Sequence, residues 1–153
     1  MSVPHEEREL ALDLPASHGA VLVARRVLRH FVRLLGLADA EVEILMLVAS
    51  ELLGNAVDHG GGAGALESAA TSPRMRLFLK LSGTGWIFRV SDEGGGDPAD
   101  VRPLLAAGAP PDLDDERGRG FFLVAQMVDR LDVEKSADGR GLTFVAAREH
   151  AGG

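Results

Sequence analysis

The sequence predicts an α/β (α+β) two-layer sandwich, in which helices cover one face of a mixed, mostly antiparallel β-sheet. The expected elements follow the order strand, helix, helix, two strands, loop, helix and two strands. The first expected strand alternates polar and apolar residues, which is typical of a strand with one buried side. The chain has 153 residues, a length that suits one domain with one core.

The N-terminal part is expected to form one strand and two helices. Residues 9–14 form the strand, which Pro15 ends. Ser17 caps a helix that extends to about Leu35 and stops at Gly36. Asp39 caps a second helix, which ends near His59. The expected buried stripe of the first helix is Val21, Ala24, Leu28, Phe31 and Leu35, and that of the second is Val42, Leu45, Met46, Ala49, Leu52, Leu53 and Ala56.

The C-terminal part is expected to complete the sheet. Residues 60–73 are rich in Gly, Ala and Ser and form a flexible loop inside the domain. Residues 94–120 form a long, proline-rich and acidic segment, and such segments are usually functional or disordered. The expected elements are strands at 75–81 and 86–90, a short helix at 99–106, a third main helix at 121–131, and a closing hairpin of 132–135 and 142–148.

Composition excludes several classes of function. The net charge is −7, whereas a general nucleic-acid binder needs a basic surface, so we expect no direct nucleic-acid partner. The absence of cysteine excludes disulfides, thiolate metal sites and cysteine nucleophiles. No apolar run is long enough to span a bilayer, and the acidic N-terminus is unlike a signal peptide. We therefore expect a cytoplasmic protein that does not bind membranes.

A polar row on the second expected helix is the first candidate site. Glu51, Asn55, Asp58 and His59 have helical spacing, and apolar residues flank the row on both sides. A solvated helix face would explain the spacing alone, but the apolar flanks favour a cleft wall. A glutamate there can accept a proton, and an asparagine oxygen can ligate Mg²⁺ when phosphates supply most of the charge.

Three glycine-containing motifs are modest signals when each is taken alone. Asp92 and Gly94 to Gly96 follow an expected strand, where glycines would let a flat ring approach the backbone. Gly118-Arg119-Gly120 opens an expected helix, whose free N–H groups suit phosphate, and Arg117 adds positive charge. Gly141-Leu142-Thr143 begins the last strand, where threonine is common in any case.

The order and spacing of these motifs are much more specific than the motifs themselves. Glu-x-x-x-Asn on a helix, Asp-x-Gly-x-Gly after a strand, Gly-x-Gly before a helix and Gly-x-Thr in a last strand resemble the GHKL ATP-binding family. That family includes gyrase, the ninety-kilodalton heat-shock chaperone, histidine kinases and mismatch-repair ATPases. The compact form, with residues 50–59 and 118–124, looks most like the bacterial anti-sigma-factor serine/threonine kinases.

The resemblance implies a Bergerat ATP-binding fold over residues 1–153, with a core at about 9–148 and a lid over ATP at about 94–117. It implies that Glu51 is the general base and that Asn55 ligates magnesium. It assigns Asp92 to the adenine amino group, and Gly94 and Gly96 to the adenine pocket. The phosphates would meet Gly118 and Gly120, and Thr143 would support the adenine side. His59 would support the site or be a buried, hydrogen-bonded residue. Because the lid contains no lysine, Arg117 or Arg119 would meet the γ-phosphate.

The resemblance also implies a function and partners. An anti-sigma-factor kinase would transfer the γ-phosphate of ATP, with Mg²⁺, to a serine of an anti-anti-sigma protein, and would bind a sigma factor in its other state. Homodimers are frequent among such kinases. Two alternatives remain open at this point: a catalytically weak ATP-binding partner-switch module, and a detached histidine-kinase-like ATPase domain. The arginine stripe Arg25, Arg29 and Arg33 is expected to be a solvated helix face, with an acidic partner protein as the alternative.

Overall fold

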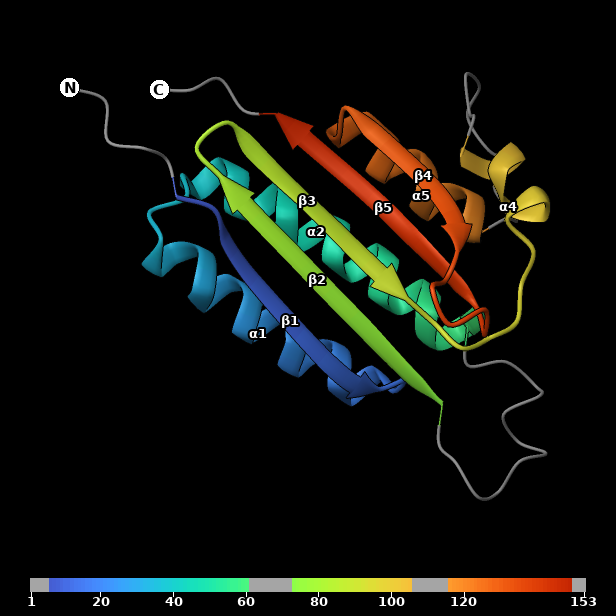
Figure 1. The fold of residues 1–153 in the computed structure, drawn as a ribbon. Helices are drawn as coiled ribbons and strands as arrows, with labels where there is room; N and C mark the ends of the chain where they lie inside the picture. The colour runs from blue at the N-terminus through green and yellow to red at the C-terminus, as the bar shows by residue number, and fades with distance from the viewer. Residues whose placement is uncertain (1–5, 61–72, 106–115, 150–153) are drawn as a thin grey trace.

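Five strands form one open sheet in the computed structural model, which describes residues 6–60, 73–105 and 116–149 (Figure 1). The strands are β1 (Arg8–Pro15), β2 (Arg74–Ser82), β3 (Gly85–Ser91), β4 (Arg130–Lys135) and β5 (Leu142–Glu149). Their spatial order is β1-β2-β3-β5-β4, and every adjacent pair is antiparallel. The sequence predicted a mixed, mostly antiparallel sheet, and the observed sheet is wholly antiparallel.

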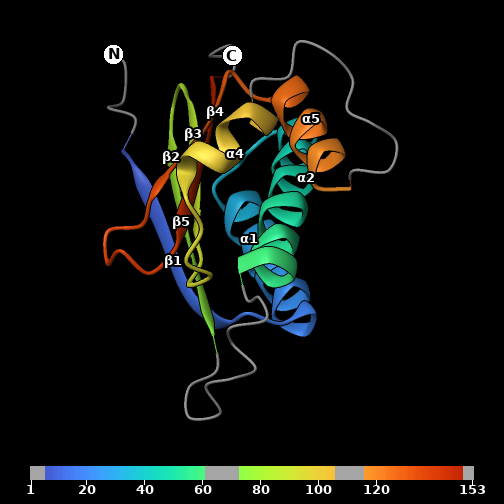
Figure 2. The ribbon, with the colours of Figure 1, turned by 90° about the vertical axis from the view of Figure 1, so that its right-hand side faces the viewer.

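Helices cover one face of this sheet, as the sequence predicted. Figure 2 shows the sheet edge-on, with α1 (His18–Leu34), α2 (Asp39–Asn55) and α5 (Glu116–Met127) on the same side. The short helix α4 (Pro98–Leu105) packs beside β4 and α5. The α/β sandwich is thereby confirmed, and α2 lies centrally, between α1 and α5.

Local signals explain where the first two helices begin and end. The Ser17 side chain accepts a hydrogen bond from the backbone nitrogen of Ala20 at 3.2 Å, which confirms the predicted cap of α1. The helix stops where Gly36 takes a φ of 83°, a left-handed conformation that suits glycine. The predicted cap Asp39 is wrong, because Ala38 is the N-cap of α2 and makes no side-chain cap bond. Asp39 instead lies in the first turn, where a carboxylate favours the positive end of the helix dipole.

The core lies between the helices and one face of the sheet. Leu77 in β2 and Phe88 in β3 point into it and are buried, whereas Arg76 and Arg89 lie on the other face and are exposed. Every residue predicted to be buried in the second helix is buried. In the first helix two predicted core residues are exceptions. Phe31 is only partly buried, and Leu35 has 38% of its surface exposed because the helix has ended there.

The third main helix differs from its prediction at both ends. Residues 121–131 were expected, but α5 extends from Glu116 to Met127. Its start includes Gly118 and Gly120, which are weak helix formers that the sequence placed before the helix. At the other end, Arg130 and Leu131 pair with β5 and begin β4, so sheet pairing overrides the helical pattern. The motif Gly118-Arg119-Gly120 consequently lies inside the first turns of α5.

Some predictions fall outside the described residues. The expected loop at 60–73 lies there except for Gly60 and Pro73, and so does the part of the expected lid at 106–115. Within the described ranges, no helix combines the length and the apolar character that crossing a bilayer requires.

Candidate functional site

The polar row of α2 lines a cavity, as its apolar flanks indicated. The cavity has a volume of about 160 Å³. The last residues of the row belong to a π-helical turn, Ala56–Gly60, that directly follows α2, and such turns are frequent at functional sites. The cavity is lined by Ser50, Glu51, Gly54, Asn55, Asp58, His59, Arg117, Gly120 and Phe121. Opposite α2, the wall is therefore the start of α5.

The Glu51 carboxylate lies directly against the backbone of Gly120. A Cβ atom at Gly120 would lie 2.5 Å from Glu51 Oε2, so a larger residue there would make the Glu51 carboxylate move. Glu51 is partly buried, and this burial raises the pKa of its carboxyl group. A carboxylate in such a position is suited to accept a proton.

Asn55 and Arg117 are joined across the cavity. Arg117 Nε donates a hydrogen bond to Asn55 Oδ1 at 2.8 Å. Asn55 is 8% exposed, and its Nδ2 is buried without a hydrogen-bond partner among the described residues. The Arg117 guanidinium also lies over the ring of Phe121, 5.6 Å from the centroid. A single amide oxygen, held by a cation, thus faces the space between α2 and α5.

A second cavity, also of about 160 Å³, shares His59 and Arg117 with the first. It extends from the end of β3 to α4 and the start of β5. Its lining residues are His59, Asp92, Gly94, Gly96, Asp97, Asp100, Val101, Arg117 and Leu142. Small-molecule sites usually measure roughly 300 Å³ or more, so the shared walls favour one ligand that spans both cavities.

Asp92 is held so that one of its carboxylate oxygens stays available. Asp92 is 3% exposed. Its Oδ1 accepts hydrogen bonds from the backbone nitrogens of Gly94 at 3.0 Å and Leu142 at 3.1 Å. No described residue donates to Oδ2. A buried carboxylate with one free acceptor can bind a ligand's amino group.

Two glycines near Asp92, Gly141 and Gly96, allow neighbouring atoms to approach the backbone closely. A Cβ at Gly141 would collide with the backbone carbonyl and the Oδ1 of Asp92, so β5 can approach Asp92 only with glycine at this position. At Gly96, a Cβ would lie 3.0 Å from Leu142 Cδ1, which is a very tight contact. Gly95 has a φ of 75°, in the left-handed region that glycine adopts without strain. The triple glycine therefore makes a tight, strand-terminating bend at the cavity wall.

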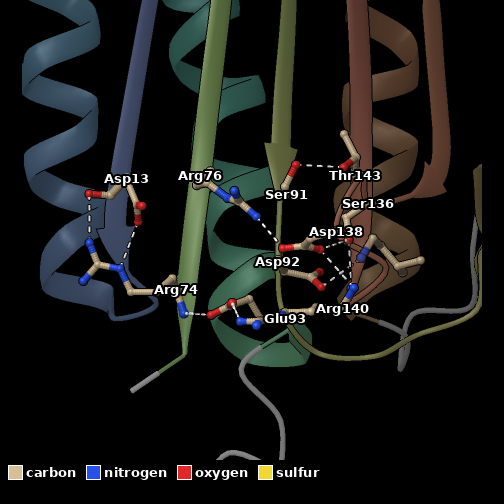
Figure 3. A network of polar contacts seen from close by, with 12 residues as sticks. Asp13, Arg74, Arg76, Ser91, Asp92, Glu93, Ser136, Asp138, Arg140 and Thr143 are labelled. Atoms are coloured by element: carbon tan, nitrogen blue, oxygen red, sulfur yellow. Dashed lines mark hydrogen bonds and ion pairs between the residues drawn. The ribbon is translucent and has the colours of Figure 1, made fainter. Parts of the chain in front are cut away.

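Polar contacts tie this bend to the neighbouring strands (Figure 3). Glu93 accepts a hydrogen bond from the backbone nitrogen of Arg74 at 2.6 Å and pairs with Arg140 at 3.4 Å. Asp138 accepts from the Arg140 backbone nitrogen at 2.9 Å and from the Ser136 hydroxyl at 2.8 Å. These contacts join the start of β2, the end of β3 and the turn between β4 and β5.

Eight predicted site residues line the two cavities. Glu51, Asn55 and Gly120 line the first, Asp92, Gly94 and Gly96 line the second, and Arg117 lines both. His59 also lines both and is exposed, so the alternative of a buried histidine is wrong.

Three predicted residues are absent from the linings of these cavities. Gly118 is buried within α5, and Arg119 is exposed on that helix. The Thr143 hydroxyl lies 2.7 Å from the Ser91 hydroxyl and links β5 to β3. Helical winding explains the first two, because residues one apart on a helix face different directions.

Sequence reasoning missed several cavity residues. Asp97, Asp100 and Val101 come from the segment that leads into α4 and from α4 itself. The helix predicted at 99–106 agrees closely with α4, but no local pattern places it beside Asp92. Ser50 and Gly54 follow from the helical spacing of Glu51 and Asn55, which would have found them. Phe121 was assigned only to the third helix, and it stacks on Phe144 of β5 with 5.2 Å between centroids. That contact fixes the start of α5 against the sheet.

Comparisons with known proteins agree with this geometry. The family model of the histidine kinase-like ATPase domain matches residues 14–146. No curated protein matches the sequence.

Solved structures with the same fold include three from bacteria. The chain is similar to the RsbU and RsbW domains of Rv1364c from Mycobacterium tuberculosis, with a TM-score of 0.63 and 16% identity. The match covers 94% of this chain but only 33% of the Rv1364c chain. The chain is also similar to the SiaB-SiaC complex from Pseudomonas aeruginosa, with a TM-score of 0.65, 15% identity and coverage of 90% and 89% of the two chains. The mycobacterial sensor histidine kinase MprB gives a TM-score of 0.51 at 16% identity, with coverage of 95% and 97%. This chain spans about a third of the first of these structures.

Proposed function

This chain belongs to the histidine kinase-like ATPase domain family, and from that premise we propose that it is an ATP-dependent protein serine/threonine kinase of the anti-sigma-factor type. It would transfer the γ-phosphate of ATP to a serine of an anti-anti-sigma protein and sequester a sigma factor in its other state. The observation that carries the proposal is that Glu51, Asn55 and Asp92 line two cavities with shared walls.

The second cavity suits an adenine base. Asp92 Oδ2 would accept a hydrogen bond from the adenine amino group, because the two described donors at this carboxylate both bind Oδ1. Gly94 and Gly96 would let the ring approach the backbone, and Thr143 would support that side through Ser91. His59 and Arg117 form the shared wall, where the ribose and phosphates would pass from one cavity to the other.

The first cavity suits the phosphates and a magnesium ion. The described residues contain no cluster of three or more His, Cys, Asp or Glu side chains that could hold a metal. Mg²⁺ is commonly bound through one or two protein oxygens together with phosphate oxygens, and Asn55 Oδ1 is an oxygen of that kind. When bound, the ion would neutralise charge on the phosphates. Arg117 lines both cavities and would supply positive charge there, and we propose that Gly118, Arg119 and Gly120 lie near the phosphates, because they share the first turns of α5 with it.

Glu51 would act as the general base. A serine hydroxyl of the partner protein would attack the γ-phosphorus and give its proton to the Glu51 carboxylate. The new O–P bond forms as the bond between the γ-phosphorus and the bridging oxygen breaks, and ADP leaves. Such phosphoryl transfers depend mainly on positioning and charge stabilisation. The raised pKa of Glu51, caused by its burial, suits a group that must bind a proton.

The experiment is phosphotransfer from labelled ATP with magnesium to candidate anti-anti-sigma proteins, compared between wild type and Glu51→Ala. We expect labelled serine with wild type and none with the variant, while both bind ATP. If no partner is labelled and the variant matches wild type in every assay, the kinase proposal is wrong.

Two alternatives predict other outcomes of the same assay. A catalytically weak partner-switch module would bind ATP tightly without turnover and would capture a sigma factor, and the acidic residues Asp97 and Asp100 beside the second cavity favour it. A detached histidine-kinase-like ATPase domain would label a histidine of its partner.

The wider setting is part of the same proposal. We place the protein in the cytoplasm as a single ATP-binding domain, with a core at about 9–148 and residues 94–117 as the lid over ATP. The proposal includes no nucleic-acid or membrane partner, and it is compatible with a homodimer. Sedimentation with and without ATP would measure the oligomeric state, and a pull-down from the native cell would identify the protein partners.

A further inference from the structure

One hydrogen bond in the candidate site conflicts with the role proposed for its acceptor. Asn55 Oδ1 is the atom proposed to ligate magnesium, yet it accepts a hydrogen bond from Arg117 Nε at 2.8 Å. A guanidinium and a divalent cation repel each other, so binding of both to one oxygen is unfavourable. Resting on the proposed function, we propose that Arg117 is a positioning residue that occupies the magnesium ligand in the nucleotide-free protein and releases it only when magnesium arrives with the nucleotide phosphates.

The state of the Asn55 amide supports this inference. Asn55 is 8% exposed, and its Nδ2 is buried with no hydrogen-bond partner among the described residues. The bond from Arg117 is therefore what orients the amide within the described part of the chain. A buried amide tends to satisfy its hydrogen-bonding capacity, so Arg117 holds Oδ1 toward the cavity, in the orientation a metal needs. Arg117 therefore holds the Asn55 oxygen in the orientation that suits magnesium and, at the same time, blocks that oxygen.

The surroundings of Arg117 show where its side chain can go. Arg117 lies at the start of α5 and lines both cavities. Its guanidinium lies 5.6 Å from the centre of the Phe121 ring, and that ring stacks on Phe144. A guanidinium can remain over an aromatic face while its donors turn toward another acceptor. Phosphate oxygens between the cavities would be such an acceptor, because arginine binds phosphate through paired donors.

The exchange makes nucleotide and magnesium binding depend on Arg117 in opposite ways. Without magnesium, Arg117 would strengthen nucleotide binding by contacting phosphate. With magnesium, part of the binding free energy that the metal contributes would be lost, because Asn55 must first be released from Arg117. Coupling between two such equilibria is reciprocal, so it can be measured from either ligand.

The test measures the affinity for ADP and for a non-hydrolysable ATP analogue by calorimetry, with and without magnesium. The variants are Arg117→Gln, Asn55→Ala and the double variant, with Arg26→Gln as the control because Arg26 is exposed on α1. We expect Arg117→Gln to weaken binding without magnesium by about tenfold and to increase the gain from magnesium by about tenfold, a typical coupling. Asn55→Ala should remove the gain in both backgrounds, and Arg26→Gln should match wild type.

The outcomes separate the inference from the proposed function. Equal gains from magnesium in wild type and Arg117→Gln, with nucleotide bound by both, would overturn the inference alone. Failure of wild type to bind any nucleotide would overturn the proposed function as well. If Arg117→Gln unfolds, Arg117→Lys serves instead, because it keeps the charge but lacks Nε. It should then give a gain from magnesium larger than that of wild type when the inference holds, and the wild-type gain when it fails.

Discussion

The backbone nitrogen of Leu142 donates a hydrogen bond to Asp92 Oδ1 at 3.1 Å, and this contact joins the end of β3 to the start of β5. The backbone nitrogen of Asp92 in turn donates to the Leu142 carbonyl at 2.9 Å. The two residues therefore hold each other by a reciprocal pair of bonds. Since Asp92 Oδ1 is used in this way, the proposed adenine contact falls to Oδ2, and the two backbone hydrogen bonds fix the orientation of the carboxylate.

Asp92→Asn tests this orientation. The Asn Oδ1 can keep both backbone hydrogen bonds, which places the amide nitrogen where Oδ2 was, and that nitrogen would face the adenine amino group donor to donor. We expect ATP affinity to fall by about 1–3 kcal/mol, the penalty of an unsatisfied buried polar group. Calorimetry measures it, and Asp39→Asn, exposed at the start of α2, is the matched control. Equal affinities of Asp92→Asn and wild type would contradict the adenine assignment.

Gly141→Ala should disturb the same contact from the other side. The added Cβ would collide with the carbonyl and Oδ1 of Asp92, so β5 or the carboxylate must move. Overpacking of this kind typically costs about 1–3 kcal/mol of folding stability. We expect a lower midpoint in thermal unfolding together with weaker ATP binding.

Gly19→Ala is the control for that substitution. A Cβ at Gly19, in the first turns of α1, would meet nothing within 4 Å. Alanine is the better helix former by up to about 1 kcal/mol, so this variant should be as stable as wild type or more stable. A loss of stability equal in both variants would show that the crowding at Asp92 is not the cause.

Sequence reasoning found the site where chemistry and local pattern coincide. The row from Glu51 to His59 was readable because helical spacing alone places those residues on one face. Asp92 was readable because a carboxylate before three glycines ends an apolar strand. These residues line the cavities, and they could be predicted without knowledge of the tertiary structure.

Other features depend on contacts between distant segments, which no local pattern contains. The start of α5 was misplaced because Gly118 and Gly120 have poor helix propensity, while tertiary packing of Phe121 on Phe144 holds the helix in place. The Arg117–Asn55 bond spans 62 residues in sequence. The Thr143 hydroxyl contacts Ser91 across the sheet, and only the strand register places the two side by side.

Glu51→Gln should separate catalysis from stability. Burial raises the pKa of Glu51 in the folded protein, so ionisation there opposes folding. The stabilising effect of the raised pKa is fully present below the ordinary value of 4.5 and is lost as the pH rises through the folded value. At neutral pH the Gln variant should therefore unfold at or above the wild-type temperature, with the advantage shrinking toward pH 4, while phosphotransfer falls by about 10²–10⁴-fold.

Glu43→Gln on the same helix is a control of opposite sign. Glu43 is exposed, and its hydrogen bond and ion pair with Arg29 lower its pKa from 4.5. Its contribution is present above that value and is lost as the pH falls. Glu43→Gln should be slightly less stable than wild type at neutral pH and should keep full activity. Unchanged phosphotransfer in Glu51→Gln would remove Glu51 from the base role.

Asp138 should titrate unusually low. The backbone N–H of Arg140, the Ser136 hydroxyl and the Arg76 guanidinium hydrogen-bond its carboxylate and lower its pKa from 3.8 to about 2. The folded-state value is the lower one, so the stabilisation is present above pH 3.8 and is lost as the pH falls toward 2. Carboxyl NMR titration measures the pKa, and the stability difference between wild type and Asp138→Asn should vanish over the same range. A carboxyl titrating near 3.8 would contradict the network.

Arg148 is expected to be the most important ion-pair residue for folding among the described pairs. Its Nε lies 3.0 and 2.9 Å from the two carboxylate oxygens of Glu41, and its Nη1 donates to the Met127 carbonyl at 2.6 Å. These contacts join β5 to the start of α2 and the end of α5. The two side chains are 26% and 13% exposed, so the pair is largely removed from solvent.

Arg148→Ala should therefore cost about 1–3 kcal/mol of unfolding free energy, because a carboxylate and a carbonyl lose a mostly buried donor. Arg29→Ala removes the more exposed pair with Glu43, and such surface pairs contribute about 0.2–1 kcal/mol. Urea unfolding of the two variants at one pH and salt concentration gives both values. Arg148→Lys should recover only part of the loss, since one ammonium cannot reach Glu41 and the Met127 carbonyl as the guanidinium does. Equal losses in Arg148→Ala and Arg29→Ala would show that the anchoring of both helices to β5 rests on apolar packing alone.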